Sequence, residues 1–229
     1  MGSIAENLQD IEDHIHRACA RAGRDRASVR LMAVSKQQPP EKLLEALGCG
    51  IRLFGESRVQ ETMEKRTLFP DDAEVHLVGH LQRNKARDAA GFYDAVQSLD
   101  AVRTVEALET RLAAAERRIT AMVEVNTSGE ESKQGVWRYD ELLQVAGAIE
   151  NAPHLELNGV MTIGPISSDE TVLRRAFAAL REFRDRLEND LGHALPELSM
   201  GMSNDFEEAI LEGATLVRIG TTLFGERSR

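Results

Sequence analysis

The chain has 229 residues, of which 42% are hydrophobic and 29% charged, a composition typical of globular proteins and not of disordered or collagen-like chains. Its formal net charge of −10 argues against nonspecific nucleic-acid binding, which needs a concentrated basic surface. No apolar run approaches the roughly 20 residues that span a bilayer, and the first residues lack the pattern of a signal peptide. The two cysteines, Cys19 and Cys49, lie in apolar stretches and predict no disulfide framework. We therefore expect a cytoplasmic protein with neither nucleic-acid nor membrane partners.

The chain opens with a predicted amphipathic helix within residues 1–24, where Ile4, Leu8, Ile11 and Ile15 form one apolar stripe. After it, short β-rich apolar runs alternate with segments of helical period. The runs predicted as strands are, in chain order, 31–34, 51–54, 75–78, 95–99, 119–125, 157–163, 198–200 and 215–219.

The segments between these strands have helical character. The predicted helices include 41–48, a polar helix from Ser57, a basic helix start at 82–85, the stretches around 102–112 and 142–149, a long helix over 173–191, a helix at 204–211 and a final turn at 222–225. No linker or composition shift divides the chain. We therefore expect one domain over 1–229, with the helix of 1–24 packed on it.

Alternating strands and helices predict an α/β fold with a parallel sheet and right-handed crossovers. Eight such units in 229 residues fit a single (β/α)8 TIM barrel, for which about 250 residues is typical. A doubly wound open sheet is the main alternative, and periodicity does not separate the two.

In a barrel, functional residues lie at the C-terminal ends of the strands. Lys36 directly follows the first strand, so its side chain is expected at the barrel mouth. A lysine with a buried stem there loses its proton more easily and can attack a carbonyl group. The alternative is a strand-end lysine that simply reaches solvent.

Two turns near the C-terminus suggest a phosphate site. Ser203 follows the seventh strand, and Gly220 and Thr221 follow the eighth, so small residues and free N–H groups meet at two helix starts. Arg218, near the end of a buried strand, needs a partner inside the barrel mouth. The alternative is that Ser203 is an ordinary helix cap and Arg218 pairs with a carboxylate.

A lysine and a phosphate site together suggest a ligand with an aldehyde and a phosphate. Pyridoxal 5′-phosphate (PLP) has both and would bind Lys36 as a Schiff base. A phosphorylated sugar or keto acid on the same lysine fits nearly as well. The histidines lack metal-ligand spacing, so no zinc site is expected.

Several motifs in one order along nearly the whole chain resemble the PLP homeostasis proteins, single-domain PLP binders related to the N-terminal barrel of alanine racemase. The matching stretches are 31–36 (LMAVSK), 54–61 (FGESRVQE), 79–85 (GHLQRNK), 125–135 (VNTSGEESKQG), 159–165 (GVMTIGP), 198–206 (LSMGMSNDF) and 218–221 (RIGT). Such an ordered set is far more specific than any of its members.

The resemblance implies a barrel of the alanine racemase N-terminal type that holds PLP on Lys36. It also implies phosphate contacts from Ser203, Gly220 and Thr221, helped by the backbone near Met202. Arg218 would face the pyridine nitrogen and keep it unprotonated, which weakens the ring as an electron sink.

The sequence departs from the family at Ser57, where relatives usually carry Asn in a turn beside the cofactor, and at Val75, where they favour an aromatic residue. Ser57 is expected to reach the cofactor through water. Whether His80 and Lys133 touch the cofactor is left open by the sequence.

Alanine racemase also needs a tyrosine from a second domain, and this chain has only Tyr93 and Tyr139 and no residues left for that domain. The resemblance therefore implies a monomeric PLP carrier that exchanges PLP with apo-enzymes and has no robust catalytic activity. A minimal PLP-dependent amino-acid racemase, or another Schiff-base enzyme, is the alternative.

Overall fold

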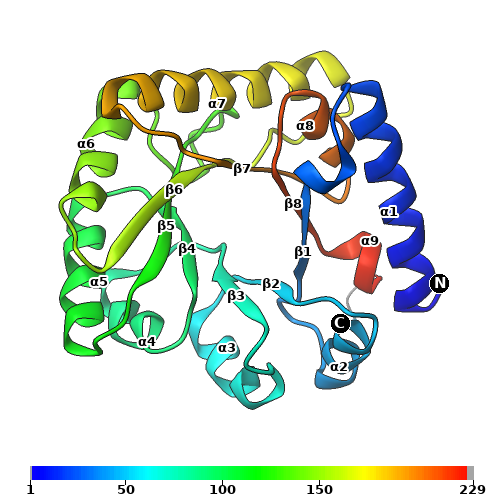
Figure 1. Ribbon diagram of the computed structural model, residues 1–229, viewed down its shortest axis with the longest axis horizontal. Coiled ribbons are helices and arrows are strands. Elements are labelled where there is room, and N and C mark those ends of the chain that lie inside the picture. The colour runs from blue at the N-terminus through cyan, green and yellow to red at the C-terminus, as the bar shows by residue number, and fades with distance from the viewer. Residues whose placement is uncertain (1, 226–229) are drawn as a thin grey trace.

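The computed structural model describes residues 2–225, which form a closed barrel of eight parallel strands (Figure 1). Each strand pairs with the next along the chain, and β8 returns to β1 with Ala33 opposite Ile219. The strands are β1 (Arg30–Val34), β2 (Leu53–Glu56), β3 (Glu74–Leu77), β4 (Ala95–Leu99), β5 (Ile119–Glu124), β6 (Leu155–Met161), β7 (Glu197–Met202) and β8 (Leu216–Ile219). The predicted (β/α)8 barrel is confirmed, and the open-sheet alternative is excluded by the β1–β8 pairing.

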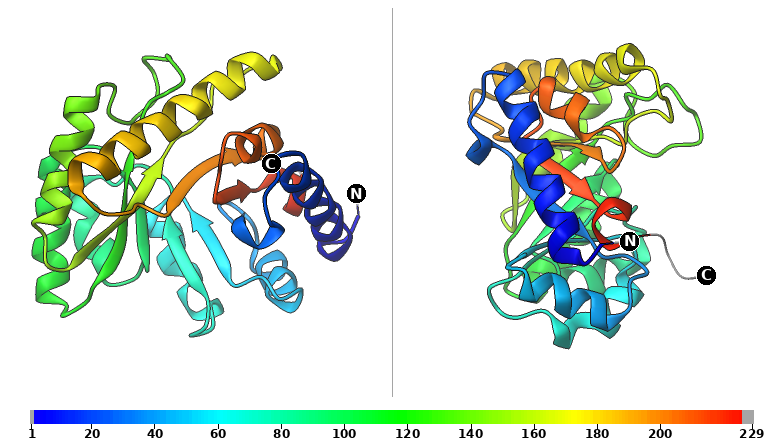
Figure 2. Two further views of the ribbon diagram at one scale, coloured as in Figure 1. Left: turned by 45° about the horizontal axis from the view of Figure 1, so that its top comes forward. Right: turned by 90° about the vertical axis from the view of Figure 1, so that its right-hand side faces the viewer.

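Helices surround the barrel on its outer side (Figures 1 and 2). The α-helices are α1 (Ile4–Arg21), α2 (Pro40–Gly48), α3 (Val59–Lys65), α4 (Ala86–Ala90), α5 (Val102–Ala114), α6 (Tyr139–Glu150), α7 (Glu170–Leu191), α8 (Phe206–Leu211) and α9 (Thr221–Phe224). Short 3-10 turns lie at Arg26–Ser28, Arg66–Leu68 and Arg83–Lys85. None of the helices described has both the length and the apolar character needed to cross a bilayer.

The strands bury both of their faces, which explains why they read as near-continuous apolar runs. The outer face of the barrel packs against the helices in one large core. A separate small apolar cluster, made of Met32, Leu53, Met122 and Leu216, joins β1 and β2 to β5 and β8. Strands on opposite sides of a closed barrel can meet only through its interior, so this cluster fills the barrel centre.

Helix α1 closes the outside of the barrel beside β8 and β1. Ser3 and Glu6 form a capping box at its start, which satisfies backbone N–H groups of the first turn. Ile11 and Ile15 of the predicted stripe are buried, and α1 packs mainly on α8 and α9 (Figure 2). Of the predicted domain 1–229, residues 1 and 226–229 lie outside the described part.

The second strand lies two residues further along the chain than predicted, at Leu53–Glu56 instead of 51–54. The reason is Glu56, a fully buried acid in the strand. Its Oε1 accepts a hydrogen bond from the Ser35 hydroxyl at 2.7 Å and lies 3.4 Å from the ammonium of Lys65. A hydropathy pattern predicts that a glutamate lies outside a strand, because the pattern contains no information about partners that are distant in sequence.

Candidate functional site

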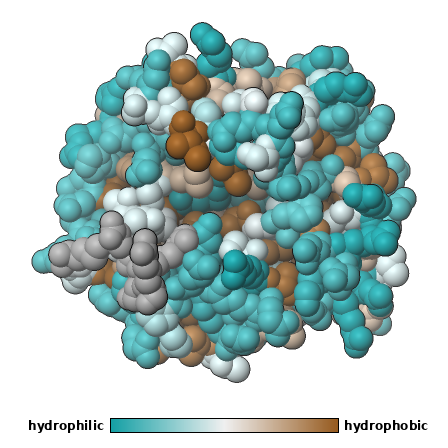
Figure 3. Space-filling model, turned by 180° about the vertical axis from the view of Figure 1, so that it is seen from behind, coloured by the Kyte–Doolittle hydropathy of each residue, from teal (hydrophilic) through white to brown (hydrophobic). Residues whose placement is uncertain are grey.

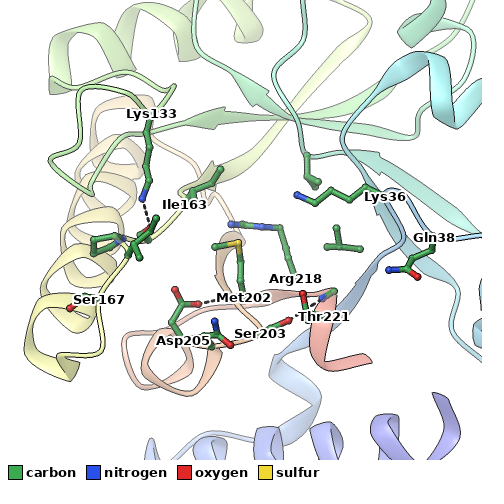
Figure 4. Close-up of a pocket in the computed structure, with 17 residues that line it drawn as sticks. Lys36, Gln38, Lys133, Ile163, Ser167, Met202, Ser203, Asp205, Arg218 and Thr221 are labelled. Carbon is green, nitrogen blue, oxygen red and sulfur yellow. Dashed lines mark hydrogen bonds between the residues drawn. The ribbon is translucent and has the colours of Figure 1, made fainter. Parts of the chain in front are cut away.

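A cavity of about 420 Å³ opens at the C-terminal ends of the strands. Figure 3 shows the face opposite to that of Figure 1, which is hollowed near its centre. The volume is that of a small-molecule site, typically about 300–1,000 Å³. The lining residues are Val34, Lys36, Gln38, Val78, Lys133, Ile163, Gly164, Pro165, Ile166, Ser167, Met202, Ser203, Asn204, Asp205, Arg218, Gly220 and Thr221 (Figure 4).

Lys36 lies in the tight turn that follows β1. The Lys65 ammonium donates to the carbonyl oxygen of Ser35 at 2.8 Å, and the Gln37 N–H donates to the carboxylate of Glu61. The peptide groups on both sides of Lys36 are therefore held by α3. Gln37 adopts a left-handed conformation with φ of 58°, which turns the chain sharply after the lysine. The side chain of Lys36 lines the cavity (Figure 4).

On the β7–β8 side, backbone donors converge on one point. The N–H groups of Gly220 and Thr222 donate to the hydroxyl oxygen of Ser203 at 3.2 and 3.3 Å. A Cβ added at Gly220 would meet Val34 at ordinary contact distances, 3.5 Å and beyond. Packing therefore does not require glycine here, and the absence of a side chain leaves the backbone open to the cavity. Two N–H groups aimed at one oxygen suit a phosphate oxygen equally well.

Arg218 rises from β8 into the same cavity and is 3% exposed (Figure 4). Its Nη1 donates to the carbonyl and the hydroxyl of Ser199, both at 2.7 Å, and its Nη2 donates to the carbonyl of Thr162 at 2.7 Å. Burial lowers the pKa of Arg218 to about 10, and Asp205 and Glu124 oppose that shift. The guanidinium therefore stays charged at neutral pH. Three of its five N–H donors are used in these bonds, which leaves capacity for a ligand.

The cavity is lined by more positive than negative side chains. Lys36, Lys133 and Arg218 are cationic, and Asp205 is the acid among the lining residues. Lys133 donates to the Glu130 carboxylate and to the carbonyl of Gly164, each at 2.7 Å, so it ties the loop after β5 to the loop after β6. A local excess of positive charge in a chain of net charge −10 suits an anionic ligand.

Glu124 is a buried acid at the C-terminal end of β5 and is 4% exposed. Burial raises its pKa to about 7, the charge of Asp100 raises it further, and that of Arg218 lowers it. Burial likewise raises the pKa of Asp205 and of Glu56. Three buried acids at this end of the barrel thus have pKa values above their ordinary range.

The raised pKa of Glu124 predicts a pH-dependent stability. With a pKa of about 7 when folded and 4.5 ordinarily, the folded chain binds more protons than the unfolded chain between these values. Stability therefore falls as pH rises through this window, by up to about 3 kcal/mol at about 1.4 kcal/mol per pKa unit. Urea unfolding at pH 5 and pH 8 measures this, with Glu124→Gln as the comparison. If the difference in the free energy of unfolding between the two proteins is the same at pH 5 and pH 8, the prediction is wrong.

Six of the seven predicted site residues line this cavity: Lys36, Met202, Ser203, Arg218, Gly220 and Thr221. Ser57 is not among the lining residues. It lies in the β2–α3 loop, where its carbonyl would be 2.2 Å from a Cβ added at Gly79. Its contact with a ligand, and the roles assigned to the other six, stay predictions.

Of the two residues left open by the sequence, Lys133 lines the cavity and His80 does not. His80 is exposed, and its Nδ1 lies 3.6 Å from the carboxylate of Asp100. Across the described residues, no group of three or more His, Cys, Asp or Glu side chains could hold a metal ion.

Sequence reasoning named neither Gln38 nor Glu124, and it used the loop 163–167 only as part of the matching stretch 159–165. The loop had a usable signal, because a Gly-Pro pair directly after a strand marks a turn at the barrel mouth. Glu124 had one as well, since a glutamate that ends an apolar strand needs a buried partner. Gln38 carried no pattern that distinguishes it from a surface glutamine.

The comparisons with known proteins agree with this architecture. Residues 6–228 match the family model described as the alanine racemase N-terminal domain. The pyridoxal phosphate homeostasis protein of Aquifex aeolicus is 41% identical over 98% of this chain and 99% of its own length. The structure of PipY of Synechococcus elongatus with PLP bound has a TM-score of 0.82 at 33% identity, covering 97% of this chain and 100% of PipY. A histidine racemase from Leuconostoc mesenteroides shares the fold alone, at 19% identity, a TM-score of 0.75 and 57% of its chain.

The closed barrel and its cavity place the protein in the class of alanine racemase N-terminal barrels. Within that class, the full-length identity shows that the chain belongs to the pyridoxal phosphate homeostasis protein family.

Proposed function

We propose that this chain binds PLP in the cavity at the C-terminal ends of its strands and acts in PLP homeostasis, holding the cofactor and delivering it to apo-enzymes. The observation that carries the proposal is that Lys36, the Ser203–Gly220 turn pair and Arg218 line one cavity. These groups match three polar parts of PLP, which are its aldehyde, its phosphate and its ring nitrogen. A sugar phosphate would use the first two but has no ring nitrogen for Arg218.

Each group has a distinct role in this proposal. The amine of Lys36 adds to the aldehyde carbon and the aldehyde oxygen leaves as water, which gives a Schiff base. The phosphate binds to the backbone N–H of Thr221, to the hydroxyl of Ser203 and to the N–H of Gly220, which exchanges its bond to the Ser203 oxygen for one to a phosphate oxygen. The charged Arg218 donates to the ring nitrogen and keeps it unprotonated. PLP supplies an electrophilic aldehyde and a conjugated ring, whose capacity to accept electrons is weakened by that unprotonated nitrogen.

The same geometry supports a carrier rather than a racemase. Both tyrosines of the chain lie outside the cavity-lining set. Tyr93 is buried with its hydroxyl 2.6 Å from that of Thr62, and the hydroxyl of Tyr139 donates to Asp190 on α7 at 2.6 Å. Neither is placed to act as the second acid or base that racemisation needs. The proposal includes a monomer that works in the cytoplasm, where the thiols of Cys19 and Cys49 stay reduced.

A spectroscopic titration tests the binding proposal. PLP added to the purified protein is expected to give a visible absorbance band that saturates at one equivalent and disappears on borohydride reduction. The reduced mass is expected on the peptide that contains Lys36. If no band forms, the PLP proposal is wrong, and a phosphorylated sugar or keto acid becomes the expected ligand of the cavity.

Two further measurements separate a carrier from an enzyme. The holo-protein incubated with L-alanine in deuterated water is expected to leave Cα unlabelled, whereas deuterium at Cα with turnover would support the racemase alternative. PLP is expected to reach an apo-enzyme faster than it dissociates into buffer. Equal rates would mean that direct hand-over is wrong and that the protein only stores PLP.

A further inference from the structure

An unbroken chain of polar side chains crosses the barrel interior from the cavity to the opposite end. Arg218 Nη1 lies 2.7 Å from the hydroxyl of Ser199, and that hydroxyl lies 2.6 Å from Oε1 of Gln97. Nε2 of Gln97 lies 2.9 Å from Nδ1 of His76, whose Nε2 lies 3.4 Å from the carboxylate of Glu74. The four strands involved are β8, β7, β4 and β3, and β4 and β7 are not neighbours.

The interior members of this chain are inaccessible to water. Ser199 and Gln97 are 0% exposed and His76 is 5% exposed. A buried polar group without a partner is costly, so each of these groups depends on the next. The terminal carboxylate of Glu74 is held in turn by Arg30 at 2.5 Å at the other end of the barrel.

The chemistry at the two ends sets the direction of every bond. Arginine only donates, so the Ser199 hydroxyl oxygen accepts from Arg218 and directs its own hydrogen to Oε1 of Gln97. The amide nitrogen of Gln97 is then left facing His76, so Nδ1 of His76 must accept. The ring proton of His76 therefore sits on Nε2, where it points at the carboxylate of Glu74.

We propose that Gln97 is a positioning residue that couples Arg218 in the cavity to the tautomer of His76 on the far side of the barrel. Its amide oxygen holds the Ser199 hydroxyl in the orientation that receives the guanidinium, and it acts together with the carbonyls of Ser199 and Thr162 to fix where Arg218 points. Turning the amide over would remove the oxygen that accepts the hydrogen of the Ser199 hydroxyl, and that hydrogen would lose its partner. The guanidinium and the imidazole thus have one compatible arrangement.

Nuclear magnetic resonance of the histidine ring nitrogens tests this coupling in the full chain without PLP, so it does not depend on the proposed function. In the wild type, His76 is expected to carry a proton on Nε2 and to accept a hydrogen bond at Nδ1. In Gln97→Glu the amide N–H that faces Nδ1 is replaced by a carboxyl oxygen, so the Nδ1 signal of His76 is expected to shift. Gln144→Glu makes the same change at an exposed site of α6 and should leave His76 unchanged.

A wild-type His76 with its proton on Nδ1 would overturn the proposal, because the Gln97 amide would then face it with oxygen. An unchanged Nδ1 signal of His76 in a folded Gln97→Glu protein would overturn it as well. The wild-type measurement stands even if that variant does not fold.

A second readout rests on the proposed function and uses PLP itself. Gln97→Leu and Ser199→Ala should each weaken PLP binding about tenfold, and the double variant should be no weaker than either, because both break one chain. If the two losses in PLP affinity multiply in the double variant, the coupling is contradicted. Failure of PLP to bind the wild type would overturn the proposed function, while the His76 tautomer would still decide the inference on its own.

Discussion

Replacing Lys36 with alanine is expected to abolish the borohydride-stable attachment of PLP completely and to weaken its binding by roughly 100-fold, about 3 kcal/mol. The reason is that the phosphate turns and Arg218 remain, so residual noncovalent binding survives while the covalent bond cannot form. The measurement is the visible absorbance band during PLP titration, with mass analysis of the reduced peptide. Because Lys36 projects from a turn and its side chain lines a cavity, its loss should leave the fold intact.

Lys133→Ala is the matched control, because Lys133 is the other lysine that lines the cavity. Its ammonium is engaged by Glu130 and by the carbonyl of Gly164, so we expect its removal to preserve the attachment at Lys36. Attachment that persists in Lys36→Ala and disappears in Lys133→Ala would show that the assignment is wrong. It would place the reactive amine on the loop after β5 instead of on the turn after β1.

Arg218→Leu is expected to destabilise the protein by about 1.5–3 kcal/mol, the cost of losing buried hydrogen bonds that a charged group makes. The substitution leaves the carbonyl of Thr162 and the Ser199 oxygens without the donors that they now have. It also removes the cation that lowers the pKa of Glu124 and Asp205. Urea unfolding of the PLP-free protein at pH 7 measures the loss.

Arg218→Lys separates charge from geometry. A lysine retains the positive charge near Glu124 but cannot reproduce the fork of bonds to Ser199 and Thr162. We therefore expect Arg218→Lys to lower the free energy of unfolding, but by less than Arg218→Leu does. A change below about 1 kcal/mol in Arg218→Leu would mean that the interior polar chain adds little to stability and that the arginine serves the ligand alone.

The sequence was most informative where one element was followed by an unusual residue. The run Leu31–Val34 predicts a buried strand from hydropathy alone, and the lysine two residues later is then at the barrel mouth for any parallel sheet of this kind. Ser203 and Gly220 were placed by the same rule. These predictions depend on local pattern and on one property of parallel sheets, which is why they needed no distances.

Other features depended on partners distant in the chain and could not be read in the same way. Glu56 extends β2 because Ser35 and Lys65 reach it from other elements. Gln97 reads as one polar residue in a short strand, and only the closed barrel brings it to Ser199, which is 102 positions away. Ser57 was predicted in the site because it occupies a position where relatives carry Asn beside the cofactor, yet it lies outside the cavity-lining set.

The sequence established the alternation of strands and helices, the identity of the strand-end residues and the likeness to a PLP-binding family, because each depends on neighbours in the chain or on motif order. Only the tertiary structure decided that the sheet closes between β1 and β8, that Lys36, Ser203 and Arg218 share one cavity, and that a polar chain runs beneath them. Closure is a long-range pairing, and the protonation of buried groups such as Glu124 depends on what surrounds them after closure.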